Sequence, residues 1–144
     1  MFTLRARVLQ YGREHLITEG FKEINTPKII ASASEGGTNL FPMMYFDTPA
    51  FLSQSPQLYK QLAVLGGMER VFEIGPAFRA ENHDTYRHLN EFISFDIEAA
   101  WMTDEDVMGV QERMIHHIWK CVAANDQEHI ATINAYRELS LIHI

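Results

Sequence analysis

The sequence has little cysteine, no long apolar run and no excess of positive charge. Its single cysteine, Cys121, excludes an internal disulfide and a cysteine-based zinc site. No apolar run reaches the roughly 20 residues that a membrane-spanning helix needs. The opening MFTLRAR is not followed by the apolar core of a signal peptide. These absences predict an intracellular, cytoplasmic protein without a membrane partner.

The charge balance is acidic, with 12 Lys and Arg against 19 Asp and Glu and a formal net charge of −7. A protein that binds nucleic acid by itself usually carries a basic face, so this class is disfavoured. One local patch could still contact nucleic acid. The length of 144 residues and the hydrophobic content of 47% are sufficient for one domain with a real core.

The most informative stretch is VFEIGPAFRAENHDTYRHLNEFISFDIE, residues 71–98. Residues 71–81 and 91–98 mix β-branched and aromatic residues with polar ones, which predicts two strands. Residues 82–90 form a connection longer than a tight turn, and long ordered loops are usually functional. Packing alone does not require the Arg, Glu and His residues that gather on this hairpin.

The N-terminal part predicts a helix over residues 4–19, followed by Gly20 as a left-handed cap. A strand over residues 21–24 is ended by Pro27, so it should be an edge strand or lie at an interface. The stripe of the helix consists of Leu4, Val8, Tyr11 and Leu16.

Two short strands are expected over residues 44–47 and 50–53, with Thr48-Pro49 as the turn. A helix should follow over residues 56–65. Its buried stripe would consist of Leu58, Leu62 and Leu65. Gln57 and Lys60 share one helical face, for which a solvated surface is the usual interpretation.

Residues 31–39, ASASEGGTN, form a small-residue loop that carries Glu35. The loop lacks the Lys and Ser/Thr of a phosphate-cradling loop. From the residues alone, Glu35 is either an acid of an exposed turn or a ligand-binding acid.

After the hairpin, Thr103 and Asp106 resemble a capping box that starts a helix over residues 104–124. Its predicted buried positions are Val107, Val110, Met114, Ile118 and Cys121. His116 and His117 are interpreted as surface or interface residues, because adjacent helical positions diverge by about 100°.

Residues 126–138 predict only a poorly defined tail, which divides the chain from a main domain over residues 1–125. The final LSLIHI, residues 139–144, back-translates to CTG TCT CTT ATA CAC ATC, a transposase end used in sequencing adapters. We therefore consider it a possible translated adapter. The source nucleotides test this hypothesis.

Five motifs in order, SEGG, SPQLYK, FRAE, RHLNEF and FDIE, resemble the catalytic domain of class II aminoacyl-tRNA synthetases. Within that class, the chain is similar to aspartyl-tRNA synthetases of the archaeal and eukaryotic type, over roughly residues 4–124. GFKEINTPKI, residues 20–29, resembles motif 1 of the dimer interface, and FRAE with RHLNEF resembles motif 2. The implied fold is α+β, a partial class II core with a mainly antiparallel sheet flanked by helices.

The resemblance implies roles for individual residues. Arg79 would be the catalytic arginine that binds the α-phosphate of ATP and the carboxylate of the amino acid. The implied ATP-binding residues are Arg79, Glu81, His88, Leu89 and Phe92. The implied aspartate-binding residues are Glu35, Gln57, Lys60, Arg79 and Asp96. The implied contacts to the tRNA acceptor end are Asn82, His83 and Arg87, and Pro27 would lie at the interface of a homodimer.

The chemistry agrees with these roles, because activation joins two anions and needs fixed cations at the reacting phosphate. An arginine donates to two oxygens and stays charged. The substrate ammonium needs acids such as Glu35 and Asp96. The aspartate side chain needs a cation, which Lys60 supplies and which asparagine would not require.

The sequence also departs from the family. It lacks motif 3 with its arginine, most of the carboxylates that would hold Mg2+, and an anticodon-binding barrel. We therefore expect a fragment that cannot complete aspartate activation alone and whose sheet has an open edge. Two alternatives stay open, an asparaginyl or non-discriminating relative and a non-catalytic dimerisation or regulatory module.

Overall fold

The computed structural model describes residues 1–33, 40–82, 85 and 88–142, with side chains up to residue 135. The chain forms two units, one of residues 1–19 with 102–144 and one of residues 20–101. Strands with mainly antiparallel pairing and helices are both present, so the expected α+β class is confirmed. In the part of the chain that is described, no helix combines the length and apolarity that crossing a bilayer requires.

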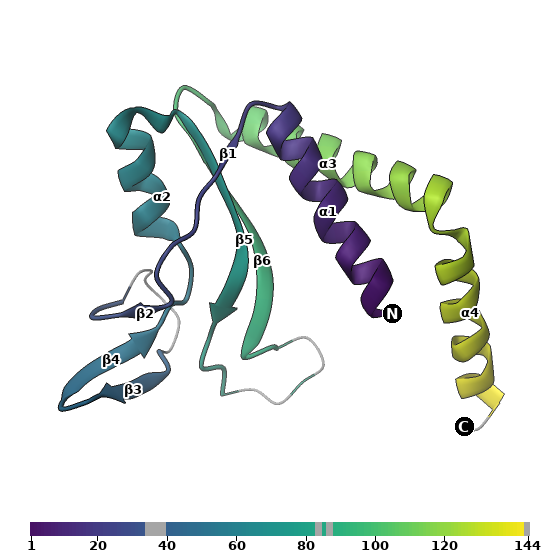
Figure 1. Cartoon of the computed structure of the whole chain (residues 1–144), viewed down its shortest axis with the longest axis horizontal. Coiled ribbons are helices and arrows are strands. Elements are labelled where there is room, and N and C mark those ends of the chain that lie inside the picture. The colour runs from purple at the N-terminus through teal and green to yellow at the C-terminus, as the bar shows by residue number, and fades with distance from the viewer. Residues whose placement is uncertain (34–39, 83–84, 86–87, 143–144) are drawn as a thin grey trace. The chain divides into compact units, whose positions relative to one another are not determined.

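The unit of residues 20–101 is built on a sheet of β1 (Lys22–Glu23), β5 (Arg70–Phe78) and β6 (Glu91–Ala99), in the order β1-β5-β6. β5 and β6 form the predicted long antiparallel hairpin, and β1 pairs with β5 in parallel (Figure 1). Val71 and Phe72 of β5 are fully buried. The hairpin is therefore the core of this unit as well as the carrier of the charged motifs.

A second sheet contains β2 (Ile29–Ile30), β3 (Pro42–Tyr45) and β4 (Thr48–Leu52), in the order β2-β4-β3. The prediction of a turn at Thr48-Pro49 is wrong, because Thr48 pairs with Tyr45 and Pro49 with Met44. The turn lies at residues 46–47, where Phe46 has a φ of 52°. β2 pairs with residues 51 and 52 of β4 and does not extend to Pro49. On that side of β4 the ladder therefore needs no N–H donor at position 49, and proline is tolerated there.

Helix α2 (Gln57–Ala63) continues into a π-helical turn, η1 (Val64–Met68). The predicted buried stripe is wrong, because Leu58, Leu62 and Leu65 are 48%, 63% and 83% exposed. The buried face carries Lys60 instead, which is 3% exposed. The pattern misleads because Lys60 has polar partners on β6, which allow a charged side chain to be buried.

The other unit consists of α1 (Phe2–Thr18), α3 (Asp104–Asn125) and α4 (Gln127–Ile142), and α1 runs beside α3 (Figure 1). Thr103 and Asp106 form the predicted capping box, with both reciprocal hydrogen bonds present. Tyr11, Leu16, Val110 and Val122 are buried. These positions confirm the predicted stripe of the first helix in part and place the core of this unit between α1 and α3.

The expected tail after residue 125 is helical in the structure, which the sequence analysis did not predict. Asp126 ends α3, and its carbonyl accepts a hydrogen bond from Ile130 N at 3.1 Å, so it also starts α4. Its side chain is buried and accepts a hydrogen bond of 2.9 Å from Tyr11 Oη. This long-range contact fixes the corner, and sequence periodicity cannot reveal it.

Candidate active site

The loop end of the β5–β6 hairpin holds the first group of predicted site residues. Arg79 N donates to Asn90 O at 3.0 Å and so extends the ladder beyond Phe78. Glu81 N donates to Arg79 O at 2.8 Å and to the side chain of Asn90 at 3.1 Å. Asn90 therefore fixes the backbone that carries both charged residues of the FRAE motif.

A cavity of about 430 Å³ lies at this end of the hairpin. Its lining residues are Arg79, Glu81, His88, Leu89 and Phe92, which are the five residues predicted to bind ATP. The guanidinium carbon of Arg79 lies 5.4 Å from the centre of the Phe92 ring, a cation–π geometry. Thr85 Oγ1 lies 2.6 Å from His88 Nδ1 and orients that ring.

The second group of predicted residues is centred on Lys60. Its ammonium lies 3.2 Å from Asp96 Oδ1 and 3.7 Å from Glu98 Oε2, and it donates to Ile97 O at 3.1 Å. The interpretation of a solvated Lys60 is therefore wrong. Two acids beside one buried lysine leave a local charge of −1, which suits a cationic ligand group.

Both groups lie on one face of the hairpin. Side chains alternate along a strand, so Phe92, Ser94, Asp96 and Glu98 of β6 point to the same side. Arg79 contacts Phe92 and Lys60 contacts Asp96, which places both cations on that side. Asp96 lies four positions after Phe92, or about 13 Å along the strand at roughly 3.3 Å per residue.

The strip between the two groups is lined by small residues. Gly75 pairs with Ser94, and Ala77 pairs with Phe92. A Cβ atom at Gly75 would lie 3.2 Å from Glu73 Oε1. The face therefore has charged groups at both ends and small side chains in the middle, an arrangement that suits an elongated ligand.

Of the other predicted site residues, those that the structure describes are not joined to either group by a hydrogen bond or ion pair. Gln57 is half-buried at the start of α2, and its backbone N–H points at Ser55 Oγ over 3.4 Å. Asn82 and Pro27 are exposed. Glu35, His83 and Arg87 lie outside the described residues.

Sequence reasoning did not assign Glu98 or Glu73 to the site. Glu98 follows Asp96 by two residues, so strand alternation could have placed it beside Lys60. Glu73 is 3% exposed, and its carboxylate lies 2.8 Å from Lys28 Nζ. No local signal identifies that pair, since it depends on the pairing of distant segments.

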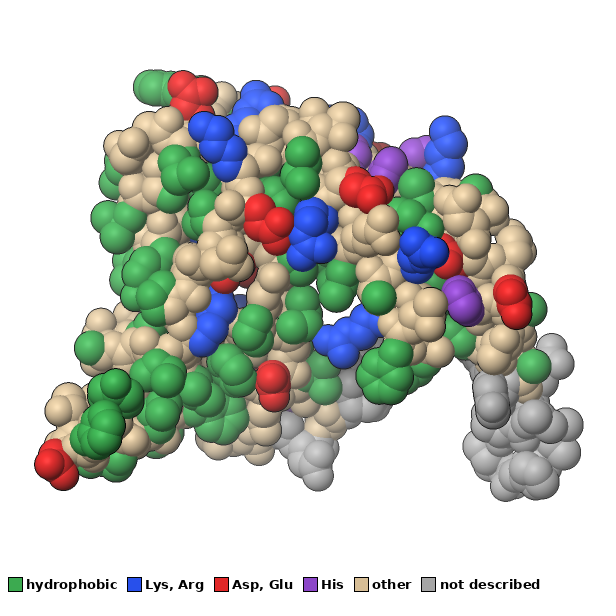
Figure 2. Space-filling model, viewed as in Figure 1, with side chains coloured by type: hydrophobic (Ala, Val, Ile, Leu, Met, Phe, Trp, Pro, Cys, Tyr) green, Lys and Arg blue, Asp and Glu red, His purple; other side chains and the backbone are tan. Residues whose placement is uncertain are grey.

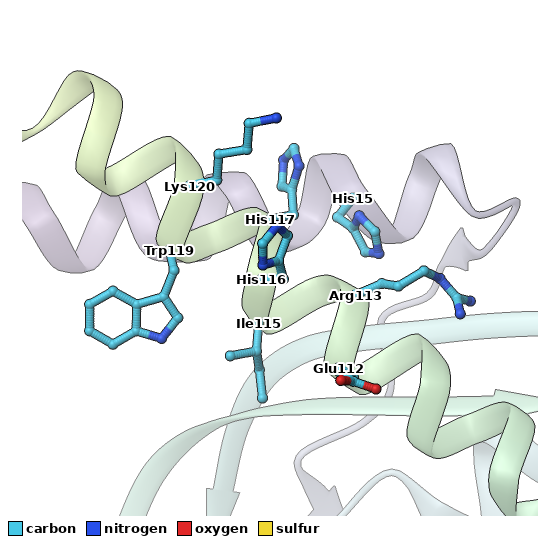
Figure 3. Close-up of a pocket in the computed structure, with 8 residues that line it drawn as sticks. All are labelled: His15, Glu112, Arg113, Ile115, His116, His117, Trp119 and Lys120. Atoms are coloured by element: carbon cyan, nitrogen blue, oxygen red, sulfur yellow. The ribbon is translucent and has the colours of Figure 1, made fainter.

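A larger cavity of about 770 Å³ lies in the helical unit. Its lining comes from His15 of α1 and from Glu112, Arg113, Ile115, His116, His117, Trp119 and Lys120 of α3 (Figure 3). The rings of His15 and His117 are 5.2 Å apart, so His117 faces α1, which fits the second part of its interpretation as a surface or interface residue. Across the described residues, no group of three or more His, Cys, Asp or Glu side chains is placed to hold a metal ion.

Residues 1–143 match the model of the family described as tRNA synthetases class II (D, K and N). The chain belongs to this family. The aspartate–tRNA(Asp/Asn) ligase of Archaeoglobus fulgidus is 49% identical over 139 residues, which cover 96% of this chain and 32% of the relative. The corresponding ligase of Methanococcoides burtonii is 52% identical over 126 residues, 88% of this chain and 28% of the relative.

Solved structures of synthetases agree with this membership. The asparaginyl-tRNA synthetase of Pyrococcus horikoshii, complexed with asparaginyl-adenylate, matches with a TM-score of 0.84 and 37% identity over 91% of this chain and 30% of the other. A putative aspartyl-tRNA synthetase of Leishmania major matches with a TM-score of 0.78 and 42% identity over 88% and 24%. The chain spans about a third of the length of the curated relatives. The predicted resemblance and fold are thereby confirmed.

Proposed function

We propose that this chain carries the ATP- and aspartate-binding part of an aspartate–tRNA ligase. The observation that supports this most is the single face of the β5–β6 hairpin that bears Arg79 with Phe92 at one end and Lys60 with Asp96 at the other. An aminoacyl-adenylate is an elongated molecule with a purine at one end and an amino acid at the other. The charges and spacing of this face fit that order.

At the nucleotide end, the cavity beside Arg79 would accept ATP. Phe92 would stack on the adenine, Glu81 would meet its amino group or surroundings, and His88 would lie near the phosphates, with Leu89 as apolar lining. Arg79 would neutralise the α-phosphate and hold the carboxylate that attacks it. Its forked guanidinium suits that task, and removing one such donor typically costs about 3–4 kcal/mol of transition-state stabilisation.

At the amino-acid end, Asp96 would accept the α-ammonium, together with Glu35 and Gln57. Lys60 would face the side-chain carboxylate of aspartate. In the structure its ammonium rests between Asp96 and Glu98. A bound aspartate would therefore exchange one anionic partner of Lys60 for another, which keeps the buried lysine neutralised.

ATP use is implied by the family, and Mg2+ would supply neutralisation of the phosphate charge. The described residues contain no carboxylate cluster for this ion, so no step here depends on it. We also propose that Asn82, His83 and Arg87 approach the tRNA acceptor end, that the complete enzyme is a homodimer, and that it is cytoplasmic.

The dimer is supported by an apolar surface over β2, β3 and β4, where hydrophobic side chains gather at the lower left (Figure 2). Ile29, Met44, Tyr45 and Phe46 are 50%, 65%, 56% and 84% exposed. Ile29 follows Pro27 by two residues, so this surface continues the segment predicted to lie at the interface. Exposed apolar patches of this kind usually mark contacts.

A second candidate is an asparaginyl or non-discriminating enzyme. The structural match to an asparaginyl-tRNA synthetase and the names of the relatives, which include both tRNA(Asp) and tRNA(Asn), favour keeping it. Lys60 argues for aspartate as the amino acid, since an amide needs no buried cation. A non-catalytic module is less well supported, because a protein that binds no substrate has no physical need for both charged groups on one face.

Binding to the purified chain tests the proposal. Calorimetric titrations with ATP, aspartate and asparagine should show ATP binding that Arg79→Ala weakens. They should also show a preference for aspartate that Lys60→Ala abolishes. Lys22→Ala, which removes an exposed lysine of the same unit, is the matched control and should change neither. Equal binding of aspartate and asparagine would favour the second candidate, and no binding of any ligand would favour the module.

A further inference from the structure

At the Lys60–Asp96 end of the proposed ligand-binding face, the side chains of Thr26, Lys28 and Glu73 form a closed cluster. Glu73 Oε1 accepts from Thr26 N at 3.1 Å and from Lys28 Nζ at 2.8 Å, and Oε2 accepts from Thr26 Oγ1 at 2.7 Å. Lys28 Nζ also donates to Thr26 Oγ1 at 3.1 Å. Glu73 is 3% exposed, so its charge depends on these partners.

The cluster lies next to the acid proposed to bind the substrate ammonium. Glu73 of β5 pairs directly with Asp96 of β6, and side chains of paired residues share one face of an antiparallel ladder. The side chain of Glu73 leans toward Gly75, where an added Cβ would lie 3.2 Å from Oε1. Glu73 therefore lies at the Lys60–Asp96 end of the site, and its carboxylate leans toward the small residues in the middle.

The charges on this face are sorted into two sets. Lys28 is neutralised by Glu73, whereas Lys60 is shared by Asp96 and Glu98. The group of Lys60, Asp96 and Glu98 keeps one excess negative charge only while Lys28 stays paired with Glu73. Asp96 is the direct cross-strand partner of Glu73, so it is an acid on the same face that Lys28 could turn to if Glu73 lost its charge.

We propose that Glu73 is a positioning residue that holds Lys28 away from Asp96 and so keeps the Asp96–Glu98 pair available for a cationic amino group. This inference rests on the proposed function and adds a role for two residues outside the motifs. Glu73 itself touches no ligand in this scheme. It acts through Lys28, and its effect should therefore be confined to ligands that carry an ammonium.

The experiment compares two stable analogues on the full 144-residue chain. Aspartyl-sulfamoyl-adenosine carries the ammonium, and sulfamoyl-adenosine lacks the amino acid. Glu73→Gln should weaken the first about tenfold, the size expected for one unit charge moved within several ångströms at intermediate dielectric. The second analogue should bind as in the wild type. The double variant Glu73→Gln/Lys28→Met removes both charges and should restore the affinity for the first analogue.

Two further variants separate charge from structure. Thr26→Val removes a hydrogen bond of the cluster but leaves every charge, so it should lower stability without changing the ratio of the two affinities. Glu73→Asp keeps the charge and should hold that ratio within about twofold of the wild type. If Glu73→Gln does not fold, the double variant alone tests the proposal. A ratio of the two affinities that differs from the wild-type ratio in the double variant would contradict the proposal.

The inference is overturned if Glu73→Gln keeps the wild-type ratio, if it weakens both analogues equally, or if the double variant is no better than the single one. Failure of the wild-type chain to bind either analogue would instead remove the proposed function itself.

Discussion

The ammonium of Lys60 lies 3.2 Å from Asp96 Oδ1 and is held in a position that is 3% exposed. Lys60→Met should leave Asp96 and Glu98 without their cation. Breaking a fully buried pair costs about 3–5 kcal/mol, and the partial exposure of both acids lowers our expectation to about 2 kcal/mol. Urea unfolding measures this loss. The exposed Lys22→Met should stay within about 0.5 kcal/mol of the wild type, and an equal loss in both variants would contradict a special role for Lys60.

Arg79 and Phe92 form a cation–π pair that lines the cavity proposed to bind ATP. Arg79→Lys should weaken ATP binding at least tenfold, because an ammonium can neither fork onto two oxygens nor stack as a planar group. Phe92→Leu should cost about 1 kcal/mol of binding energy. The chain offers a matched control, since Arg70 lies 6.0 Å from the Phe21 ring outside this cavity. Arg70→Lys should leave ATP binding unchanged, and a similar loss there would show that the effect is general.

The long hairpin could be predicted because its signals are local, whereas the ATP-binding roles proposed for its residues are what the family resemblance implies. Arg79 follows β5 and Phe92 lies near the start of β6, both at the loop end of one hairpin, so chain continuity brings them together. Thr103 and Asp106 are three residues apart, and their capping box is likewise a local geometry. Such features follow from spacing alone.

The features that were missed depend on contacts between distant segments. The buried face of α2 is set by Lys60 meeting β6, 36 residues away, which overrides the apolar pattern of Leu58, Leu62 and Leu65. The contact of Lys28 with Glu73 spans 45 residues. Helix α4 depends on a corner at Asp126 that is tied to Tyr11 across 115 residues. A single sequence carries no record of such pairings.

Aspartate-dependent exchange between ATP and pyrophosphate tests how much of the active site the chain contains. We expect no substantial exchange, because no motif 3 arginine is present to bind the γ-phosphate. ATP binding should nevertheless be measurable through the Arg79 cavity. Substantial exchange by the purified chain, abolished by Arg79→Ala, would refute this expectation.

Tyr11 and Asp126 join α1 to the corner between α3 and α4 through a hydrogen bond of 2.9 Å. Burial and this hydrogen bond raise the pKa of Tyr11 above its ordinary value. Tyr11→Phe should lower the free energy of unfolding, since Asp126 is buried and would lose a donor. Amide hydrogen exchange should show faster exchange in the first turn of α4. Tyr59→Phe, in the other unit, is the control and should leave α4 unchanged.

His15 should make the stability of the helical unit depend on pH. Burial lowers the pKa of His15 below 6.5, and His117 and Arg113 act in the same direction, whereas Glu19 opposes them. Between the lowered pKa and 6.5 the unfolded chain binds more protons than the folded one. The contribution of the buried, neutral His15 to the free energy of unfolding should therefore be fully present above about pH 7. It should decrease as the pH drops through 6.5, until His15 is protonated in the folded chain as well.

Urea unfolding at pH 7.5 and 5.5 measures the difference in the free energy of unfolding. His15→Gln should reduce it, whereas His116→Gln, at an exposed position of α3, should not. Equal pH dependence in the wild type and in His15→Gln would show that other groups cause it.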